Sequence, residues 1–496
     1  MSATDAPVVL TRVCSLWRSV ALTTPCIWAK IHIPIPGHPA SSSRCVTYLP
    51  ESVLAKRWQI FSKLMQLRCQ VVKEWLDRSG ACPLSISLSY PTNYFRLDSQ
   101  EQGVVDDDLT DPLIQVLLSF ASRWSDIHFW MPPCLYQKLD SQLWNGMLPI
   151  LQSFTAKVHS RMGRSRVNII HPNLQKLSLD AFHLMSMSNC MVLSSNQFTH
   201  LSFHTPISDQ DFFDVLRLCW CLIDCQVQLQ APWPLSRPFP SPLLPPYVKV
   251  ELPKLEKLKV YDEGGLSFVF RAIKTPSLKE LHYKSRLRYD AYDNDYSILL
   301  PAEPLFAILQ NTGASFRKLT IEPNTLRQED TPIWLHMATT VTHLVIKGSR
   351  RPIPNNGAME EDFLIHDLED FDINLLRVDN NPTPTPETPH GEILLPSLDT
   401  LEVYGVQRLT DEEIIGVLRS RIDASRRGEV SPLRRVKFQF WRQKQNDFKA
   451  EVVQYAELAE IAMELELEYP PEALISYRGR LSPSFLLPAF GENDYQ

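Results

Sequence analysis

One apolar pattern recurs along most of this chain and limits the folds that it can adopt. The pattern is an apolar residue, two polar residues, a second apolar residue, one polar residue and a third apolar residue, often preceded by proline. Clear copies start at Leu174, Phe198, Leu255, Leu278, Phe316, Val341 and Leu398. Weaker copies comprise Trp124/Ile127/Phe129, Leu222/Cys225/Val227 and Leu433/Val436/Phe438. One such unit cannot bury its own apolar face, so the copies must stack on one another.

The distance between consecutive copies is nearly constant. It is 24 residues from Leu174 to Phe198 and from Phe198 to Leu222, 23 from Leu255 to Leu278 and 25 from Phe316 to Val341. These distances lie within the roughly 20–29-residue period of leucine-rich repeats, whose short strands turn alternate residues inward. We therefore predict an α/β fold, an irregular leucine-rich-repeat solenoid of short parallel strands with helices and coils. The alternative, a βα protein that contains the pattern by chance, is disfavoured by the number of copies.

Segments between the copies indicate helices and loops. Helices are expected at Asp111–Ala121, Thr410–Ile422 and Asp447–Glu468, the last of which closes the end of the array. Loop insertions are expected near 231–247 and 350–390, because Ala231–Tyr247 and Asn380–His390 are rich in proline. The acidic stretch Glu360–Asp372 is interpreted as a solvated insertion in preference to a cation-binding site.

Composition narrows the classes of function. The chain has 39 prolines and 16 glycines, which disfavours glycine-rich phosphate loops. Lys and Arg number 50 against 56 Asp and Glu, a net charge of -6, so we expect neither a general nucleic-acid binder nor a membrane binder. No signal-peptide pattern is present, and no apolar run approaches the roughly 18 residues of a spanning helix. We expect an intracellular protein, cytoplasmic or nuclear.

The chain carries none of the common patterns of catalytic and nucleotide sites. The P-loop, dinucleotide-binding, nucleophile-elbow and His-Glu-x-x-His patterns are absent. Cys219, Cys221 and Cys225 are close enough to suggest zinc, but no Cys-x-x-Cys pair exists and Cys225 falls on the apolar register, so buried reduced thiols are favoured. A weaker cluster comprises His183, Cys190, His200 and His204. We expect no enzyme activity, no catalytic residue, no metal and no cofactor.

Basic residues gather near the end of the array. They are Arg419, Arg421, Arg426, Arg427, Arg434, Arg435, Lys437, Arg442 and Lys444. An anionic partner such as a phosphopeptide is one interpretation of this group. A solvated face of a helix and a strand is favoured, because acidic residues lie alongside these cations.

Residues 10–28 have the apolar spacing of a short amphipathic helix. Its face comprises Leu10, Val13, Cys14, Trp17 and Ala21. We expect Trp17 on the buried side of this helix, Thr24-Pro25 at its end and Trp28 just beyond. A helix this short is not stable alone, so it must pack on the array or on a partner.

Motifs near the N-terminus carry a resemblance to a known family. Val13-Cys14-x-x-Trp17-Arg18, followed by Pro25-x-Ile27-Trp28, resembles the second half of an F-box. Trp75-Leu76-Asp77-Arg78-Ser79-Gly80 and Pro83-Leu84-Ser85-Ile86-Ser87-Leu88 are similar to motifs of F-box-like leucine-rich-repeat proteins abundant in mushroom-forming fungi. The family's opening segment, Leu-Pro-x-Glu-Ile/Leu-Leu, has no counterpart before Asp5-Ala6-Pro7, so the first half of the F-box is missing. We expect either a truncated N-terminus or half of the usual adaptor-binding surface.

The resemblance implies a function and a division of the chain. It implies the substrate-recognition subunit of a Skp–cullin–F-box ubiquitin ligase, which binds a protein substrate through the leucine-rich array. The expected divisions are partial F-box-like helices at 1–36, a helical connector at 37–80, the irregular array at 81–445, and a C-terminal capping helix and tail at 446–496. The alternative is a stand-alone leucine-rich-repeat scaffold without a ligase link.

Two sets of contact residues follow from this interpretation. Contacts to a Skp-family adaptor are expected at Leu10, Val13, Trp17, Pro25, Ile27 and Trp28. Contacts to an unidentified protein substrate are expected at polar strand positions, namely Ser178, Ser202, Lys259, His282, Thr320 and Glu402. Neither nucleic acid nor membrane is expected as a partner.

Overall fold

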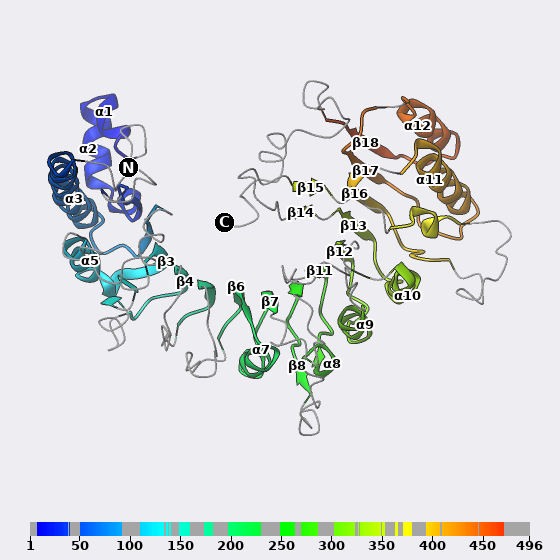
Figure 1. The fold of residues 1–496 in the computed structure, drawn as a ribbon, viewed down its shortest axis with the longest axis horizontal. Helices are drawn as coiled ribbons and strands as arrows, with labels where there is room; N and C mark the ends of the chain where they lie inside the picture. Colours follow the sequence, from blue (N-terminus) through cyan, green and yellow to red (C-terminus); the bar gives the residue numbers. More distant parts are fainter. Residues whose placement is uncertain are drawn as a thin grey trace. The chain divides into compact units, whose positions relative to one another are not determined.

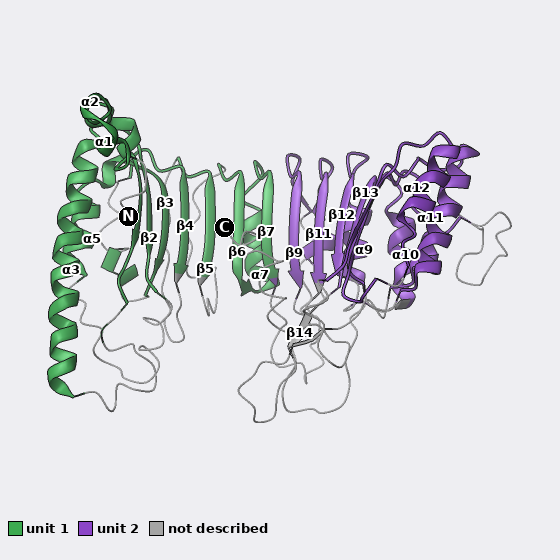
Figure 2. Cartoon of the chain, turned by 90° about the horizontal axis from the view of Figure 1, so that it is seen from above, with its two compact units in different colours: residues 1–228 green, residues 229–496 purple. Residues whose placement is uncertain are grey.

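A computed structural model divides the chain into two compact units, residues 1–228 and 229–496 (Figure 2). The residues described are 7–37, 39, 50–91, 110–132, 135–136, 138–139, 148–158, 173–181, 197–229, 249–262, 269–285, 302–322, 326, 328–348, 350–352, 363–365, 371–378, 393–406, 409–444 and 446–470. The predicted loops Ala231–Tyr247 and Asn380–His390, most of Glu360–Asp372, and the residues His183 and Cys190 lie outside them. Among the helices of the described residues, none is long and apolar enough to cross a membrane.

Unit 1 contains parallel strands that neighbour one another in chain order. They are β1 (Lys30–Pro34), β2 (Leu84–Ser89), β3 (Trp124–Met131), β4 (Ser153–Val158), β5 (Lys176–Ala181), β6 (His200–Ile207) and β7 (Asp224–Leu229), which ends one residue past the unit boundary. From β1 to β6 each strand pairs with the next, and Leu177 of β5 lies opposite Leu201 of β6. The predicted strand segments of these repeats are thereby confirmed.

Helical segments of unit 1 precede and connect its strands (Figure 1). They are α1 (Leu10–Val13), α2 (Ser15–Thr23), the 3₁₀ turn η1 (Pro25–Trp28), α3 (Glu51–Arg78), α5 (Asp111–Leu118), η5 (Ala121–Arg123) and α7 (Asp209–Leu216). α5 begins at the predicted residue, where Pro112 occupies the first turn, in which a missing N–H costs nothing.

Unit 2 repeats the same arrangement. Its strands β9 (Lys257–Asp262), β11 (Glu280–Ser285), β12 (Lys318–Glu322), β13 (His343–Lys347), β16 (Thr400–Val406), β17 (Arg435–Phe440) and β18 (Glu464–Glu468) are parallel neighbours in that order. Two short pairs flank them: β8 (Val250–Glu251) with β10 (Ile273–Lys274), and β14 (Arg350–Pro352) with β15 (Phe363–Ile365).

Helices of unit 2 pack along one face of its strands (Figure 1). They are α8 (Val269–Ala272), α9 (Glu303–Gln310), η8 (Gln328–Asp330), α10 (Thr331–Met337), η9 (Ile373–Leu376), α11 (Asp411–Arg426) and α12 (Lys449–Leu458). The predicted helix at Thr410–Ile422 is confirmed as α11. Its first turn forms a capping box, in which Thr410 accepts from the Glu413 amide and the Glu413 side chain accepts from the Thr410 amide.

The leucines of the repeats form the core between strands and helices. In unit 2 the register places Leu258, Leu281, Leu319, Leu344 and Leu401 in one row across consecutive strands. All five are buried. Because burial of one leucine contributes about 1.5–3 kcal/mol, this row alone is a major source of the stability of unit 2. The α/β fold class and the solenoid-like stacking of parallel strands are therefore as predicted.

The C-terminal element differs from its prediction. The helix expected over Asp447–Glu468 ends at Leu458, and Glu464–Glu468 is strand β18, paired in parallel with β17. The alternation Glu-Leu-Glu-Leu-Glu has the period of a strand and turns Leu465 into the core. Glu460, in the left-handed region at φ 61°, separates the two elements. A strand, with α12 before it, therefore ends the described part of unit 2.

The N-terminal segment also differs in two respects. Its helix is broken at Cys14, whose extended backbone separates α1 from α2 and whose sulfur accepts a hydrogen bond from the Trp17 amide. Residues Lys30–Pro34, assigned by sequence to the partial F-box segment, form strand β1 and pair with β2. The parallel sheet therefore begins some fifty residues earlier than the expected array at 81–445.

Candidate protein-interaction surfaces

The N-terminal helices expose several apolar side chains. Leu16, Trp17 and Val20 recur at helical spacing on α2, Val13 lies at the end of α1 before the break at Cys14, and each of the four is at least half exposed. The prediction that Trp17 is buried is therefore wrong, since its exposed fraction is 50%. Burial falls instead on Ala21, which turns toward the 3₁₀ segment η1. Isolated exposed apolar residues are ordinary, but a contiguous group of this size marks an interaction surface.

Trp28, one of the expected adaptor residues, has a structural role. Its side chain is 1% exposed in the free chain. The indole N–H donates to the carbonyl of Ala21 at 2.7 Å. The ring packs edge-on against Trp75, with centroids 4.9 Å apart, and the Arg78 guanidinium lies 5.0 Å from its centroid. Trp28 thus fixes α2 and η1 to the end of α3.

The motif that ends α3 supports the same junction. Gly80 lies in the left-handed region at φ 56°, and a Cβ at this position would lie 3.4 Å from Pro25. Ser79 is buried, and Arg123 donates to its hydroxyl. Trp75-Leu76-Asp77-Arg78-Ser79-Gly80 and Pro25-x-Ile27-Trp28 are therefore two sides of one packed contact, which explains why these residue types occur together.

Of the other expected adaptor residues, Pro25 is exposed, and Leu10 and Ile27 are half-buried.

A second apolar surface, along helix α3, was not predicted. The exposed residues are Val53, Ile60, Leu64, Leu67 and Val71. Their intervals of seven, four, three and four residues keep them on one side of the helix. This heptad-like spacing is visible in the sequence and was the signal that could have identified the stripe.

The polar face of the strands contains the expected substrate residues. In unit 1, Ser178 and Ser202 occupy paired positions on β5 and β6, and both are half-buried. In unit 2, Lys259, His282 and Thr320 are register partners on β9, β11 and β12. The same row continues through Val345 to Glu402 on β16. The structure thus brings the four residues of unit 2 into one row, although Thr320 is more buried than its polar position predicted.

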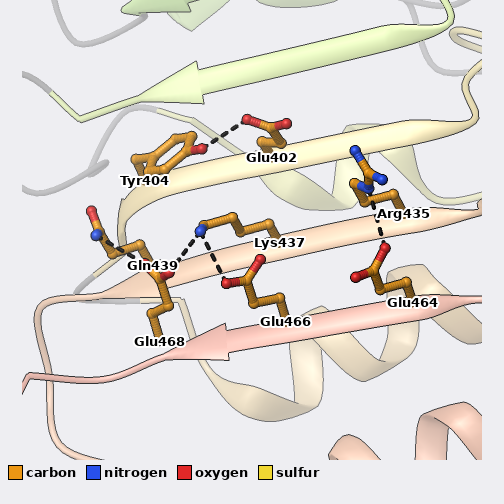
Figure 3. Close-up of polar contacts among 8 residues, drawn as sticks. All are labelled: Glu402, Tyr404, Arg435, Lys437, Gln439, Glu464, Glu466 and Glu468. Atoms are coloured by element: carbon orange, nitrogen blue, oxygen red, sulfur yellow. Dashed lines mark hydrogen bonds and ion pairs between the residues drawn. The ribbon is translucent and has the colours of Figure 1, made fainter. Parts of the chain in front are cut away.

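Charges on the last three strands of unit 2 are paired with one another (Figure 3). The Lys437 ammonium lies 3.2 Å from Glu466 Oε1 and 2.6 Å from Glu468 Oε1. Arg435 Nε lies 3.3 Å from Glu464 Oε2. The Arg435–Glu464 pair is exposed, so it contributes little to stability and is screened by salt, whereas the Lys437 side chain is only 20% exposed.

Glu402 has two partners on neighbouring positions. The Tyr404 hydroxyl donates to Glu402 Oε2 at 2.8 Å, and His343 Nε2 lies 3.1 Å from Oε1 (Figure 3 shows the tyrosine contact). The contact with His343, and then that with Tyr404, holds the pKa of Glu402 at about 2. Glu402 is therefore an anion whose acceptor positions are already engaged within the protein.

The imidazole of His282 is uncharged, and several lysines lie near it. Its ring is 5.6 Å from that of Tyr261, and Nε2 is buried without a hydrogen-bond partner in the described structure. Burial, and then the charges of Lys347, Lys259, Lys284 and Lys318, lowers its pKa to about 3. The imidazole is therefore neutral at physiological pH.

We predict that His282 makes unit 2 less stable as the pH falls. A histidine in an unfolded chain has a pKa near 6.5, so between this value and about 3 the unfolded chain binds more protons than the folded one. Its contribution to the free energy of unfolding should therefore fall by about 2 kcal/mol between pH 7 and pH 5. Urea unfolding of the wild type and of His282→Gln at both pH values measures this. The same pH dependence in both proteins would contradict the prediction.

These geometries can be set beside known proteins. The chain matches no family model and no curated protein sequence. The fold class therefore rests on the stacked parallel strands themselves. Any assignment of partners rests on the exposed apolar residues of the N-terminal helices and on the polar face of the strands.

The cysteine cluster is a part of the core. Cys219 and Cys225 are buried, and Cys221 is half-buried, with no disulfide among them. Burial raises the pKa of Cys219 to about 12 and raises that of Cys225 well above its usual value. Within the described residues, no group of three or more histidine, cysteine or acidic side chains is arranged to hold a metal ion. These thiols therefore pack as small apolar side chains, which is the favoured interpretation.

The basic group near the end of the array is largely neutralised within the protein. Arg419 pairs with Glu451, Arg427 with Glu429, Arg435 with Glu464, Lys437 with Glu466 and Glu468, Arg442 with Asp411, and Lys444 with Asp447. The favoured interpretation, a solvated face with acidic neighbours, describes most members. Arg442 and Arg421 are exceptions. The Arg442 side chain is 10% exposed and pairs with the buried Asp411. The Arg421 side chain is 1% exposed, and its guanidinium donates only to main-chain carbonyls.

Proposed function

We propose that this chain is a non-enzymatic substrate receptor that links a protein substrate to a Skp–cullin–F-box ubiquitin ligase. The observation that carries the proposal is the exposed apolar face of Val13, Leu16, Trp17 and Val20. It lies on short helices that are held to the remainder of unit 1 by Trp28. A partner that covers an exposed apolar face forms a more stable complex, because each Å² of apolar surface removed from water contributes about 25 cal/mol of favourable free energy.

The adaptor surface in this proposal consists of the accessible expected residues together with two additional ones. Val13, Trp17 and Pro25 are exposed and contact the adaptor directly. Leu16 and Val20 join them because they are exposed on the same helix, α2, as Trp17. Leu10 and Ile27 form its half-buried margin, whereas Trp28 supports the surface from below.

The polar face of the strands is the substrate-binding surface in this proposal. Its side chains come from consecutive repeats, so the residue at each position varies independently of the core leucines behind it. Ser178 and Ser202 supply hydroxyl groups in unit 1, and Lys259 and His282 supply cationic and neutral donors in unit 2. Substrate identity is therefore set by this face and not by the repeat pattern.

The adaptor contact is tested by substitution of Trp17. Truncation of a central aromatic residue in an interface costs about 2 kcal/mol or more, so Trp17→Ala should weaken binding to a purified Skp-family adaptor about thirtyfold. Titration with labelled adaptor and co-elution on a sizing column measure the change. The thermal stability of the chain should be nearly unchanged, because the side chain is half exposed.

Trp220→Ala is the matched control, because Trp220 is also 50% exposed and also belongs to unit 1. It should leave adaptor binding intact. Removal of residues 1–36 is a poorer test, since it would also delete strand β1 and disturb the sheet. If the wild type does not bind the adaptor, the ligase link fails, and the stand-alone scaffold becomes the better interpretation.

A further inference from the structure

Three lysines on the strand face of unit 2 have no acidic partner. Twelve alternate positions on β9, β11, β12 and β13 point to this face, and they include five lysines and two glutamates. Lys257 lies 3.3 Å from Glu280, and Lys284 lies 2.7 Å from Glu322. Within the described structure, no carboxylate lies within 4.0 Å of Lys259, Lys318 or Lys347. An excess of three positive charges is therefore concentrated on four neighbouring strands.

These lysines surround His282. Lys259 is its register partner on β9, and Lys318 lies two residues before its other register partner, Thr320. Lys347 lies at the end of β13, one residue beyond the pairing of Ile346 with Ile321. The charges of all three act on the imidazole. Adjacent strands are about 4.8 Å apart, so Lys259 starts one strand spacing from His282, Lys318 one strand and two residues away, and Lys347 two strands and two residues away. A common ligand above His282 is therefore reached by three extended side chains from different sides.

His282 provides a neutral donor at the centre of this group. Its Nε2 is a buried polar atom without a partner, and buried polar atoms are usually hydrogen-bonded. A neutral imidazole has one N–H, and because Nε2 has no exposed surface in the free chain, an anionic oxygen accepts from it only when the side chains that cover it move aside. Three ammonium groups around one unsatisfied donor match an anion with several oxygens and more than one negative charge.

We propose that Lys259, Lys318 and Lys347, together with His282, bind a phosphoryl group on a phosphorylated segment of the partner protein. A phosphoryl group on serine or threonine carries about −1.5 to −2 charges and three strong acceptor oxygens, whereas a carboxylate carries one charge and two oxygens. Recognition of a substrate in this way rests on the proposed function, since it assigns a chemical class to the substrate of the same face.

The neighbouring strands favour one phosphoryl group over a polyanion. On β16, β17 and β18 the strand face carries four glutamates, Glu402, Glu464, Glu466 and Glu468, against the cations Arg435 and Lys437. This half of the face has an excess of two negative charges, and the whole chain has a net charge of -6. A nucleic acid lying along the face would be repelled there, whereas a peptide with one phosphorylated residue is not.

A capped Gly-Gly-phosphoserine-Gly-Gly peptide with a fluorescent label is the probe. The full chain should bind it saturably in low salt, and should not bind the same peptide with unmodified serine. A triple variant, Lys259→Gln with Lys318→Gln and Lys347→Gln, should bind at least about tenfold more weakly, because charge-assisted hydrogen bonds are lost. The control carries Lys254→Gln, Lys274→Gln and Lys449→Gln, which remove the same charge from positions off this face, and should bind as the wild type does.

Histidine resonances give a second readout that does not depend on affinity alone. In a sample labelled with ¹³C-histidine, the signal of His282 is identified by its loss in His282→Gln. Neutralisation of Lys259, Lys318 and Lys347 by the bound phosphoryl group should raise the pKa of His282, because their charges are among the causes that lower it. An unchanged pKa of His282 on saturation with the peptide would contradict binding at this position.

Three results would overturn the proposal. They are equal binding of the phosphorylated and unmodified peptides, equal binding by the triple variant and the control, and binding of a single-stranded oligonucleotide through the same three lysines. Because no adaptor is present, failure here leaves the adaptor experiment unaffected. Conversely, loss of adaptor binding by Trp17→Ala does not bear on this site.

Discussion

Replacement of Arg421 by leucine is expected to lower the free energy of unfolding of unit 2 by about 3 kcal/mol. Arg421 lies on α11, and its guanidinium is enclosed by main-chain carbonyls. Nε donates to Leu376 at 2.9 Å, Nη2 to Leu394 at 2.5 Å, and Nη1 to Leu395 at 3.2 Å. Leucine fills part of the volume but leaves all three carbonyl oxygens without this donor.

Two opposing contributions set the size of this effect. Each buried acceptor without a donor costs about 1–3 kcal/mol, so three of them favour a large loss. Burial also lowers the pKa of Arg421 to about 10, which is a measure of the cost of holding its charge away from water. That cost is released in the variant and offsets part of the loss. The three unsatisfied carbonyls outweigh it, because together they cost about 3–9 kcal/mol.

Urea unfolding, followed by circular dichroism, measures the change, and hydrogen exchange of the β16 amides shows where it acts. Arg426→Leu is the matched control, since Arg426 lies on the same helix and is exposed. It should change the free energy of unfolding by no more than about 0.5 kcal/mol. Equal effects of the two substitutions would contradict a structural role for Arg421.

Arg421 illustrates what sequence reasoning does and does not determine. The repeat pattern was sufficient to place the strands, because each copy supplies inward-facing residues such as Leu281 and Leu319 at fixed spacing. Charged residues carry no such signal. Arg421 falls in a basic run that suggests a solvated face, and its burial depends on where the chain near Leu395 passes beneath α11.

The same limit applies to the candidate sites. The row of Lys259, His282 and Thr320 was predictable as polar strand positions, whereas the absence of a partner for Lys259 depends on the register between repeats. Register decides which glutamate faces which lysine, and it is set by the alignment of core leucines on strands that long insertions separate in the sequence. Strand β18 was predictable from the alternation in Glu464–Glu468, a signal of period two that was overlooked in favour of a terminal helix.

The two N-terminal tryptophans could not be distinguished by sequence for a related reason. Both Trp17 and Trp28 lie in apolar patterns, and local periodicity favours burial of the first. Burial is decided by Trp75, some fifty residues later, which packs against Trp28, whereas Trp17 remains exposed. A contact between distant segments therefore separates the structural residue from the candidate binding residue.

Trp28→Ala should accordingly destabilise the N-terminal end of unit 1 by about 3–5 kcal/mol. The substitution leaves a cavity, removes the hydrogen bond to the Ala21 carbonyl, and leaves Trp75 without its edge-on partner. Trp28→Phe should lower the free energy of unfolding by less, because it retains an aromatic ring against Trp75 and loses only the hydrogen bond to the Ala21 carbonyl and part of the packed volume. Hydrogen exchange of the β1 and β2 amides, with urea unfolding, measures the local and the global loss.

Trp17→Ala is the comparison that gives this experiment its meaning. It should leave amide protection in β1 and β2 unchanged and weaken only the binding of the adaptor. Trp28→Ala, in contrast, should reduce amide protection and, as a consequence, adaptor binding. At a temperature low enough to restore protection in Trp28→Ala, its adaptor binding should recover, because the exposed face of α2 is then intact. Adaptor binding that stays absent in fully protected Trp28→Ala would mean that Trp28 itself contacts the partner, against its burial in the free chain.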